Sequence, residues 1–456
     1  QTVRDFVNEG TFAWPSIIEY PCEWHGLCAL VASFGYSEVT VAVNAFNYSL
    51  IALVFPLGVY AFVTTVFPKS SIIKYSVGLV SLANIGAPWT SLAFGPLYAF
   101  CLGVCLYFYV AALFVRLLRS NDLGGMLKSG FPFLIGLLSI VMAHQSLVFV
   151  SIMLLGPYFV TILEGQSKNP RKRFTLALLG VVVILTVWTA CFNSNIFAGV
   201  LLFYHEALYP ASIAISNTIL MNLCTTMTPQ IAVGILCALG CYSLLRDRNN
   251  RWLIVSLAIA GITYALNVGT ELPIKHFLSG FWYNDHYRTA AVYALSTIPI
   301  SCYGFATLLE KLFPSGNPKC AITNGRLIRL SEAAPSVFVC LICAFVIYGP
   351  SYTASNNLTV ESTFSSYRKS VSSRFSLGPD AQCLTKDEFL FMRQVKDIVG
   401  DSSVLNYPFD GSCFAYGACD LNVINHKWWG YNEDSEDVRY SRLHIGEIGT
   451  NEKELE

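Results

Sequence analysis

Long apolar runs alternate with short polar segments between about residues 39 and 350. A helix needs about 20 apolar residues to cross a bilayer, and most of these runs approach that length. The stretch 130–163 is too long for one helix, and Ala143-His144-Gln145 lies where a tight turn would divide it. The pattern therefore predicts an all-α polytopic membrane domain of about ten spans. The expected spans are 39–67, 75–93, 96–115, 130–142, 146–163, 174–190, 231–245, 252–270, 289–309 and 334–348.

The segment before this membrane domain is mixed in character. Residues 1–38 contain one apolar stretch, 26–34, that is too short to span a bilayer. We therefore expect 1–38 to be an extracytoplasmic loop with an interfacial helix, and 39–350 to be the transmembrane helical domain. The first residue is Gln1, which suggests that the sequence is a fragment or a processed product.

The chain after residue 350 is polar and different in kind. Residues 353–376 are rich in Ser, Thr and Asn and are typical of a linker, whereas 387–399 has the spacing of an amphipathic helix. Residues 403–406 and 421–424 are candidate strands. We expect 351–456 to form an extracytoplasmic linker and a small α/β domain that is truncated at its end.

Composition and charge support a membrane location. The chain is 54% hydrophobic and 13% charged, whereas soluble proteins carry about 25% charged residues. We therefore predict a multi-pass protein of the plasma (cell) membrane, in contact with membrane lipids. Its formal net charge is zero, so nothing favours a nucleic-acid partner.

Lys and Arg are distributed unequally between the loops. Almost all of them in short loops fall in one alternating set, and the other set holds only Lys275 and Arg288. Cytoplasmic loops carry the excess of Lys and Arg in membrane proteins. The bias places the segments 1–38, 194–230 and 271–288, together with everything after about 351, on the outer face.

The block Phe281-Trp282-Tyr283-Asn284-Asp285-His286-Tyr287-Arg288 lies at this outer face, between two apolar runs. Asp285 and Arg288 are three residues apart and would share a helix face, and Asn284 or Asp285 could cap the helix. A cap and an ion pair would explain both residues structurally. The functional alternative is a phosphate site, because Arg offers a bidentate fork and a helix N-terminus adds positive charge. Lys275 and His276 could contribute to that site.

A second polar cluster, Tyr20-Pro21-x-x-Trp24-His25, begins the apolar stretch near the N-terminus. Aromatic residues stack on sugar rings, and His or Glu can transfer protons, so Tyr20, Trp24, His25 and Glu23 suit a membrane-surface pocket. Each could equally be a wetted interfacial residue. Metal-site signals are weak throughout: His205-Glu206 has no second His at the zincin spacing. The cofactor is unknown, and a divalent metal stays possible.

Several motifs resemble a family of actinobacterial multi-pass membrane proteins that lacks an assigned activity. These are Tyr20-Pro21-x-x-Trp24-His25, Ala143-His144-Gln145, Phe281-Trp282-Tyr283-Asn284-Asp285-x-Tyr287-Arg288, and Asn406-x-Pro408-x-Asp410-Gly411-Ser412-x-x-x-Tyr416. The layout of that family is similar to GT-C glycosyltransferases, which use a polyprenyl-phosphate sugar donor at the outer face.

The resemblance implies transfer of a sugar from a lipid-linked donor to a cell-envelope glycan or lipid acceptor. Arg288, with Lys275 or His276, would hold the donor phosphate, and Asp285, Glu23 or His25 would be catalytic. The expected substrate-binding residues are completed by Tyr20, Trp24, His144, Trp282, Tyr283 and Asn284. GT-C enzymes place an acidic residue in the first outer loop, after the first span. This sequence begins with what looks like the tail of that loop, so a residue upstream of residue 1 is an alternative to Asp285 and Glu23 for the catalytic carboxylate.

Two other functions fit parts of the pattern. A transporter or lipid flippase would place ionisable residues inside its spans, whereas here they avoid the span interiors. Breaks at Gly86-Ala87-Pro88 and Phe94-Gly95-Pro96 favour such a protein weakly. A non-catalytic envelope scaffold, whose tail binds a partner, is the third hypothesis.

Overall fold

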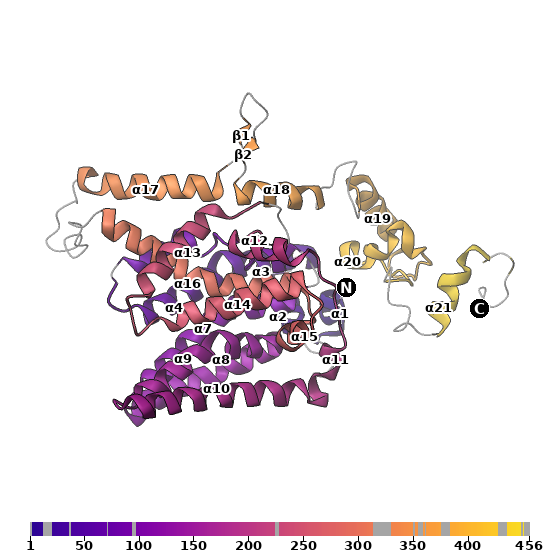
Figure 1. The fold of residues 1–456 in the computed structure, drawn as a ribbon. Coiled ribbons are helices and arrows are strands. Elements are labelled where there is room, and N and C mark those ends of the chain that lie inside the picture. The colour runs from indigo at the N-terminus through magenta and orange to yellow at the C-terminus, as the bar shows by residue number, and fades with distance from the viewer. Residues whose placement is uncertain are drawn as a thin grey trace. The chain divides into compact units, whose positions relative to one another are not determined.

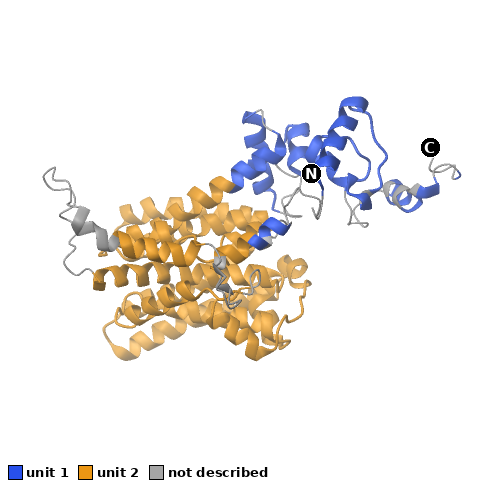
Figure 2. Cartoon of the chain, turned by 90° about the horizontal axis from the view of Figure 1, so that it is seen from above, with its two compact units in different colours: residues 1–47, 369–456 blue, residues 48–368 orange. Residues whose placement is uncertain are grey.

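The computed structural model describes most of the chain, in two compact units. Unit 1 comprises residues 1–47 and 369–456, and unit 2 comprises residues 48–368 (Figure 2). The described residues are 2–11, 21–35, 38–70, 72–93, 97–223, 228–312, 330–349, 352–353, 359–360, 362–374, 384–426, 436–447 and 450.

Unit 2 is a bundle of helices (Figure 1). Seven helical segments among the described residues are long and apolar enough to cross a membrane: Val39–Val66, Tyr98–Arg119, Leu123–Ala143, Ser146–Gly165, Pro170–Phe192, Trp252–Gly269 and His286–Leu312. The expected spans at 231–245 and 334–348 correspond to shorter apolar helices, Ile231–Leu244 and Val337–Tyr348. The chain is therefore a multi-pass, membrane-type helical protein, as the hydrophobic pattern predicts.

The elements of unit 2 are mostly helices. Unit 2 begins within α3 (Val39–Ser49) and ends within α18 (Thr363–Arg374). The elements between these two are η1 (Leu50–Val54), α4 (Phe55–Val66), α5 (Ile73–Val80), α6 (Trp89–Ala93), α7 (Tyr98–Arg119), α8 (Leu123–Ala143), α9 (Ser146–Gly165), α10 (Pro170–Phe192), η2 (Asn195–Phe197), α11 (Ala198–Leu201), α12 (Ala211–Ile219), α13 (Ile231–Leu244), α14 (Trp252–Gly269), α15 (Pro273–Ser279), η3 (Gly280–Trp282), α16 (His286–Leu312), α17 (Leu330–Tyr348), β1 (Tyr352–Thr353) and β2 (Thr359–Val360).

The expected span at 75–93 is not one helix, and that prediction is wrong. Helix α5 ends at Val80, the backbone turns, and α6 begins at Trp89 after a cis Ala87–Pro88 bond. Buried polar side chains, which a pattern of apolar residues does not reveal, stabilise the turn. Asn84 donates to the hydroxyl of Thr297 at 2.8 Å, and the Gln230 side chain accepts from the backbone N–H of Ile85 at 3.0 Å.

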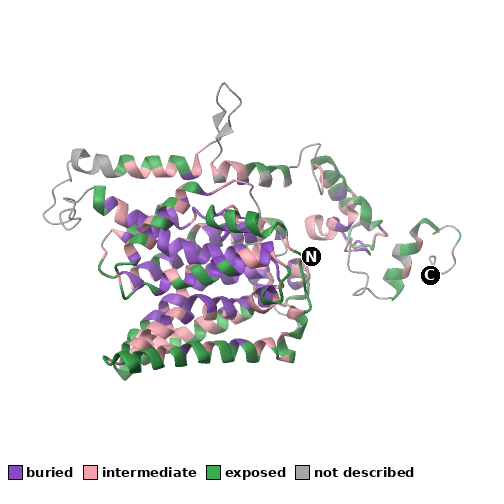
Figure 3. Ribbon diagram, viewed as in Figure 1, coloured by how far each residue is buried: buried purple, intermediate pink, exposed green. Residues whose placement is uncertain are grey.

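Helix α16 forms the centre of the bundle and is buried along most of its length (Figure 3). It packs against α13, α14 and α5. A Cβ atom at Gly240 of α13 would lie 2.1 Å from the carbonyl oxygen of Ile300, so only glycine allows this close approach. By contrast, the most apolar stretches of α8 and α10 are only 11% buried, which suits helices that face lipid.

Unit 1 combines short N-terminal helices with those of the tail. Its elements are α1 (Thr2–Glu9), α2 (Glu23–Gly35), most of α3, α19 (Lys386–Val399), η5 (Pro408–Asp410), η6 (Ser412–Phe414), α20 (Ala415–Cys419), α21 (Glu436–His444) and η7 (Ile445–Glu447). Arg4 of α1 forms an ion pair with Asp420 at 3.2 Å, and Asp5 accepts a hydrogen bond from Tyr416 at 2.7 Å. The first residues of the chain thus pack on its tail.

The tail contains the expected helix but not the expected sheet. Helix α19 begins with a capping box between Thr385 and Glu388, and Met392 lies in a small core with Ala415, Leu421 and Val423. The two candidate strands meet only at an isolated parallel bridge, Val404–Val423. The strands of the described residues are β1 and β2, which pair with each other outside this core. The α/β architecture predicted for the tail is therefore not seen, and its described part is helical.

Candidate functional site

The Trp-Tyr-Asn-Asp block forms a strained turn before α16. Tyr283 and Asn284 have φ values of 63° and 51°, in the left-handed region that non-glycine residues rarely adopt. Asp285 ends the turn: its carboxylate accepts the N–H of Tyr287 at 2.7 Å, which makes it the N-cap of α16. Non-glycine residues in such conformations cost about 1–3 kcal/mol each and cluster at functional sites. The turn is therefore the first place to look for a site.

Asp285 and Arg288 form the ion pair that their spacing predicts. The Nη1 atom of Arg288 lies 2.7 Å from Asp285 Oδ2, and the two side chains are only 12% and 7% exposed. The guanidinium lies over the Tyr283 ring, 4.4 Å from its centroid, and 5.9 Å from that of Phe100 on α7. Its Nε atom is buried and has no hydrogen-bond partner in the described structure. Arg288 thus has a free donor.

His144 approaches the same two rings from the turn between α8 and α9, where the sequence predicted a break. Its ring centroid lies 5.4 Å from that of Phe100 and 6.2 Å from that of Tyr283. Nδ1 lies 2.8 Å from the Ser146 hydroxyl and accepts the Ser146 N–H, so Nε2 carries the proton. Nε2 is buried and unpaired among the described residues. Burial and the nearby Arg288 charge lower the pKa of His144 to about 3, so its ring is neutral.

These residues form what we call the Arg288 cluster: Phe100, His144, Tyr283, Asp285 and Arg288. An unpaired buried donor costs about 1–3 kcal/mol, and native proteins rarely leave one. Here two such donors, one cationic and one neutral, lie against the same pair of rings. The arrangement suits a ligand that presents anionic oxygen atoms.

Lys275 is committed to protein contacts. Its side chain is 0% exposed, and its ammonium donates to the backbone oxygen of His205 at 2.7 Å and to Glu271 at 3.3 Å. The same ammonium lies 4.8 Å from the centroid of the Tyr204 ring. Glu271 also accepts from the Tyr204 hydroxyl and from the Ala207 N–H. In this structure Lys275 ties the 203–207 segment to α15 and presents no surface to a phosphate.

His276 and Asn284 are joined in a buried network. The Asn284 amide donates to His276 Nδ1 and to the Phe203 carbonyl, both at 2.9 Å, and accepts from the Ser279 hydroxyl at 3.0 Å. Ser279 also contacts Asn267, which donates to Thr289. Asn284 therefore fixes the turn. Ser279, Asn267 and Thr289 were not among the predicted site residues, although all three are polar residues near the ends of apolar runs.

Trp282 has a packing role in this structure. Its side chain is 0% exposed, and its ring centroid lies 6.1 Å from that of Trp188 on α10. The neighbouring Phe281 stacks on Phe149 at 3.5 Å. These aromatic contacts anchor the strained turn to α9 and α10.

The second predicted cluster, around Trp24 and His25, lies in unit 1. The Trp24 indole donates to Asn47 at 3.0 Å, and its ring meets that of His25 edge to face. Burial lowers the pKa of His25 to about 4 and raises the pKa of Glu23 above its usual value. One oxygen of Glu23 is buried without a partner in the described structure. Tyr20 lies outside the described residues.

In the part of the chain that the structure describes, no group of three or more His, Cys, Asp or Glu side chains is placed to hold a metal ion.

Comparison with known proteins identifies the chain at the level of family. It matches, over residues 18–453, the family described as "Family of unknown function (DUF6541)". The chain belongs to the DUF6541 family. Neither the comparison with curated proteins nor that with solved structures found a match for this DUF6541 chain. Since that description assigns no activity, the GT-C resemblance rests on the layout of spans and tail that the sequence predicts.

Proposed function

We propose that this DUF6541 protein is a GT-C-like glycosyltransferase that moves a sugar from a polyprenyl-phosphate donor to a cell-envelope acceptor. The supporting observation is the pair of unpaired buried donors, Arg288 Nε and His144 Nε2, at the strained turn before α16. Both would donate to oxygen atoms of the donor phosphate, and the N-terminus of α16 would add its dipole.

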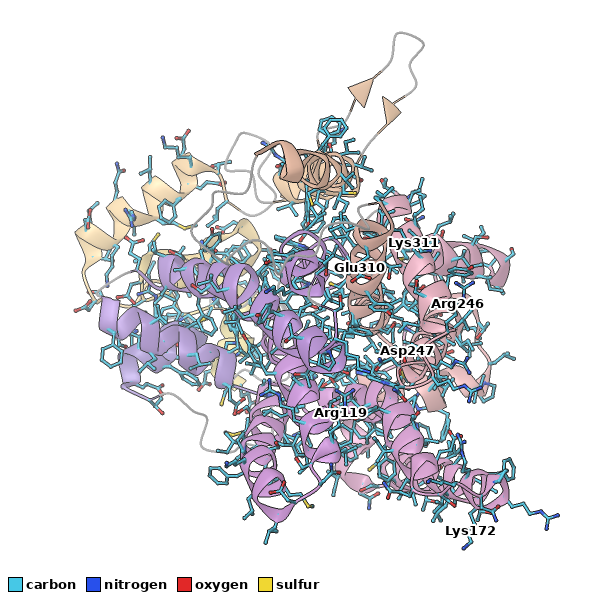
Figure 4. All side chains as sticks on the ribbon, turned by 90° about the vertical axis from the view of Figure 1, so that its left-hand side faces the viewer. Arg119, Lys172, Arg246, Asp247, Glu310 and Lys311 are labelled. Atoms are coloured by element: carbon cyan, nitrogen blue, oxygen red, sulfur yellow. The ribbon has the colours of Figure 1, made fainter. Side chains whose placement is uncertain are left out.

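The position of the Arg288 cluster within unit 2 agrees with this proposal. Helix α16 runs 27 residues, about 40 Å, from the cluster to Glu310 and Lys311. Figure 4 shows these two residues at the same end of the molecule as Arg119, Arg246 and Asp247. The Arg288 cluster is therefore at the other end of the bundle from the basic loops. If those loops are cytoplasmic, the cluster faces outward.

The chemical step would replace one bond to the anomeric carbon by another. The acceptor hydroxyl oxygen would bond to the anomeric carbon while the bond from that carbon to the phosphate oxygen breaks. The polyprenyl phosphate would leave with the bonding electrons, and the Arg288 cluster would stabilise its new charge. The hydroxyl proton would pass to a carboxylate, for which Asp285 is the candidate in unit 2, and the ion pair of Asp285 with Arg288 would open for this step.

The test is transfer by the full chain in liposomes that contain radiolabelled polyprenyl-phosphate sugars and envelope extract. We expect label to move to a new acceptor, and Arg288→Ala to abolish this. Arg171→Ala, which removes an exposed arginine of the basic loops, is the matched control and should retain transfer. Absence of transfer by the folded wild-type chain with every donor, or full transfer by Arg288→Ala, would refute the proposal.

A further inference from the structure

An apolar groove is lined by residues of α9, α10 and α14 and shares none with the Arg288 cluster. It has a volume of about 610 Å³. Its walls include Met153 and Val160 of α9, Ile184 and Leu185 of α10, and Val255 and Ile259 of α14. The helices that form it are candidate membrane spans, so the groove runs along the direction in which they cross the bilayer.

The two ends of the groove differ in charge. One end is lined by Arg173, Arg248 and Arg251 with a single acid, Glu164. The other end is closed by Trp188, Phe277 and Leu278, and Trp188 donates to the Phe277 carbonyl at 2.9 Å. A long apolar channel with a cationic mouth is complementary to a lipid that has an anionic headgroup.

The arginines at the mouth are not all neutralised by the protein. Arg173 pairs with Glu164, and Arg251 donates to the Leu245 carbonyl. Arg248 is exposed, and no hydrogen bond or ion pair holds it within the described residues. Since a backbone carbonyl carries no net charge, Arg248 and Arg251 leave two positive charges at the mouth. Arginine guanidinium groups bind phosphate through paired hydrogen bonds.

The length of the groove constrains the chain of that lipid. Arg173 and Trp188, which mark its two ends on α10, are 15 residues apart, or about 22 Å along the helix. One leaflet contributes about half of a hydrocarbon core that is about 30 Å thick. A chain that fills the groove from its basic end therefore extends past the middle of the bilayer.

We infer that the groove binds a lipid phosphate whose hydrocarbon chain is longer than one leaflet. The phosphate contacts Arg248 and Arg251, and the chain follows α10 as far as Trp188. This inference is independent of the proposed function, because the groove shares no residue with the Arg288 cluster.

The inference is tested by binding to the purified full chain in nanodiscs, with a photoactivatable long-chain polyprenyl monophosphate as the probe. We expect cross-links to peptides of α9, α10 and α14. The uncharged polyprenol of the same length and phosphatidic acid with ordinary acyl chains should each compete at least tenfold more weakly, and inorganic phosphate should not compete. Equal competition by the polyprenol would overturn the role of the phosphate. Equal competition by phosphatidic acid would overturn the length requirement.

Two kinds of variant test the basic mouth and the apolar wall of the groove separately. Arg248→Ala/Arg251→Ala should weaken binding about tenfold or more, because charged hydrogen bonds to phosphate are lost. Arg246→Ala is the matched control, because Arg246 lies in the same loop and contacts Tyr242 instead of the groove. Val181→Trp, at an exposed position of the wall, should block the chain and weaken binding without disturbing the packed interior. Unchanged cross-linking of α9, α10 and α14 in both groove variants would overturn the inference.

Discussion

Arg288, in the first turn of α16, and His144, in the turn between α8 and α9, lie against the same two aromatic rings, and each keeps a buried N–H without a partner in the described structure. Arg288 is a permanent cation. His144 is held neutral by burial and by the Arg288 charge, which lower its pKa to about 3. A neutral donor beside a cation can bind a phosphate without adding repulsion between the two protein groups.

Arg288→Lys should lower transfer by about 10²–10³-fold, because lysine keeps the charge but loses the guanidinium donors that the leaving phosphate would need. The measurement is kcat/KM with the lipid-linked donor. Arg288→Ala should also destabilise the fold, by about 3–5 kcal/mol, because Asp285 would remain buried without its partner.

A double variant separates stability from function at this pair. Asp285→Asn/Arg288→Met removes both charges together and should recover much of the stability that Arg288→Ala loses. It should remain inactive. Recovery of transfer along with thermal stability would show that Arg288 acts only through folding.

His144→Gln should change the pH dependence of stability. In the unfolded chain His144 titrates near 6.5, and in the folded chain near 3. Between these values the unfolded state binds more protons, so this residue makes stability fall as pH is lowered from about 6.5, by up to about 1.4 kcal/mol per pH unit. The Gln variant, which retains an N–H donor, should flatten the thermal unfolding profile between pH 4 and 6. An unchanged slope would contradict the assigned burial of the neutral ring.

The local features of the Arg288 cluster were predictable from sequence. The three-residue spacing of Asp285 and Arg288 predicted their ion pair, and Ala143-His144-Gln145 predicted the break that carries His144. Both depend on residues close together in the chain. The meeting of His144 with Arg288 depends on how α7, α8 and α16 pack, which the pattern of apolar runs does not contain.

Other features depended on polar groups inside apolar runs. The hydropathy of 75–93 favours a span, but Asn84 and Gln230 supply side-chain hydrogen bonds that stabilise a break in the middle of it.

The surroundings of Lys275 also depend on polar groups that are distant in the sequence. The sequence showed a second cation, Lys275, on the same loop as Arg288. It did not show that the Lys275 ammonium would donate to the carbonyl of His205 and the carboxylate of Glu271.

Lys275→Met should therefore affect stability and not donor recognition. The variant leaves Glu271 and the carbonyl of His205 without their charged donor, so the thermal unfolding temperature should fall. At a temperature where the variant is folded, KM for the lipid-linked donor should match that of the wild-type chain. A large rise in KM with unchanged stability would instead support direct contact of Lys275 with the phosphate.

Asp285→Asn tests the proton acceptor. Asparagine keeps the size of the side chain and an oxygen atom that can accept the Tyr287 N–H, but it removes the base, so kcat should fall by about 10²–10⁴-fold. Asp122→Asn, at an exposed aspartate of the basic loops, is the control and should leave kcat unchanged. Because loss of the ion pair with Arg288 also lowers stability, kcat is measured at a temperature where each variant is folded. Normal turnover by Asp285→Asn would show that Asp285 caps α16 and positions Arg288 without accepting the proton.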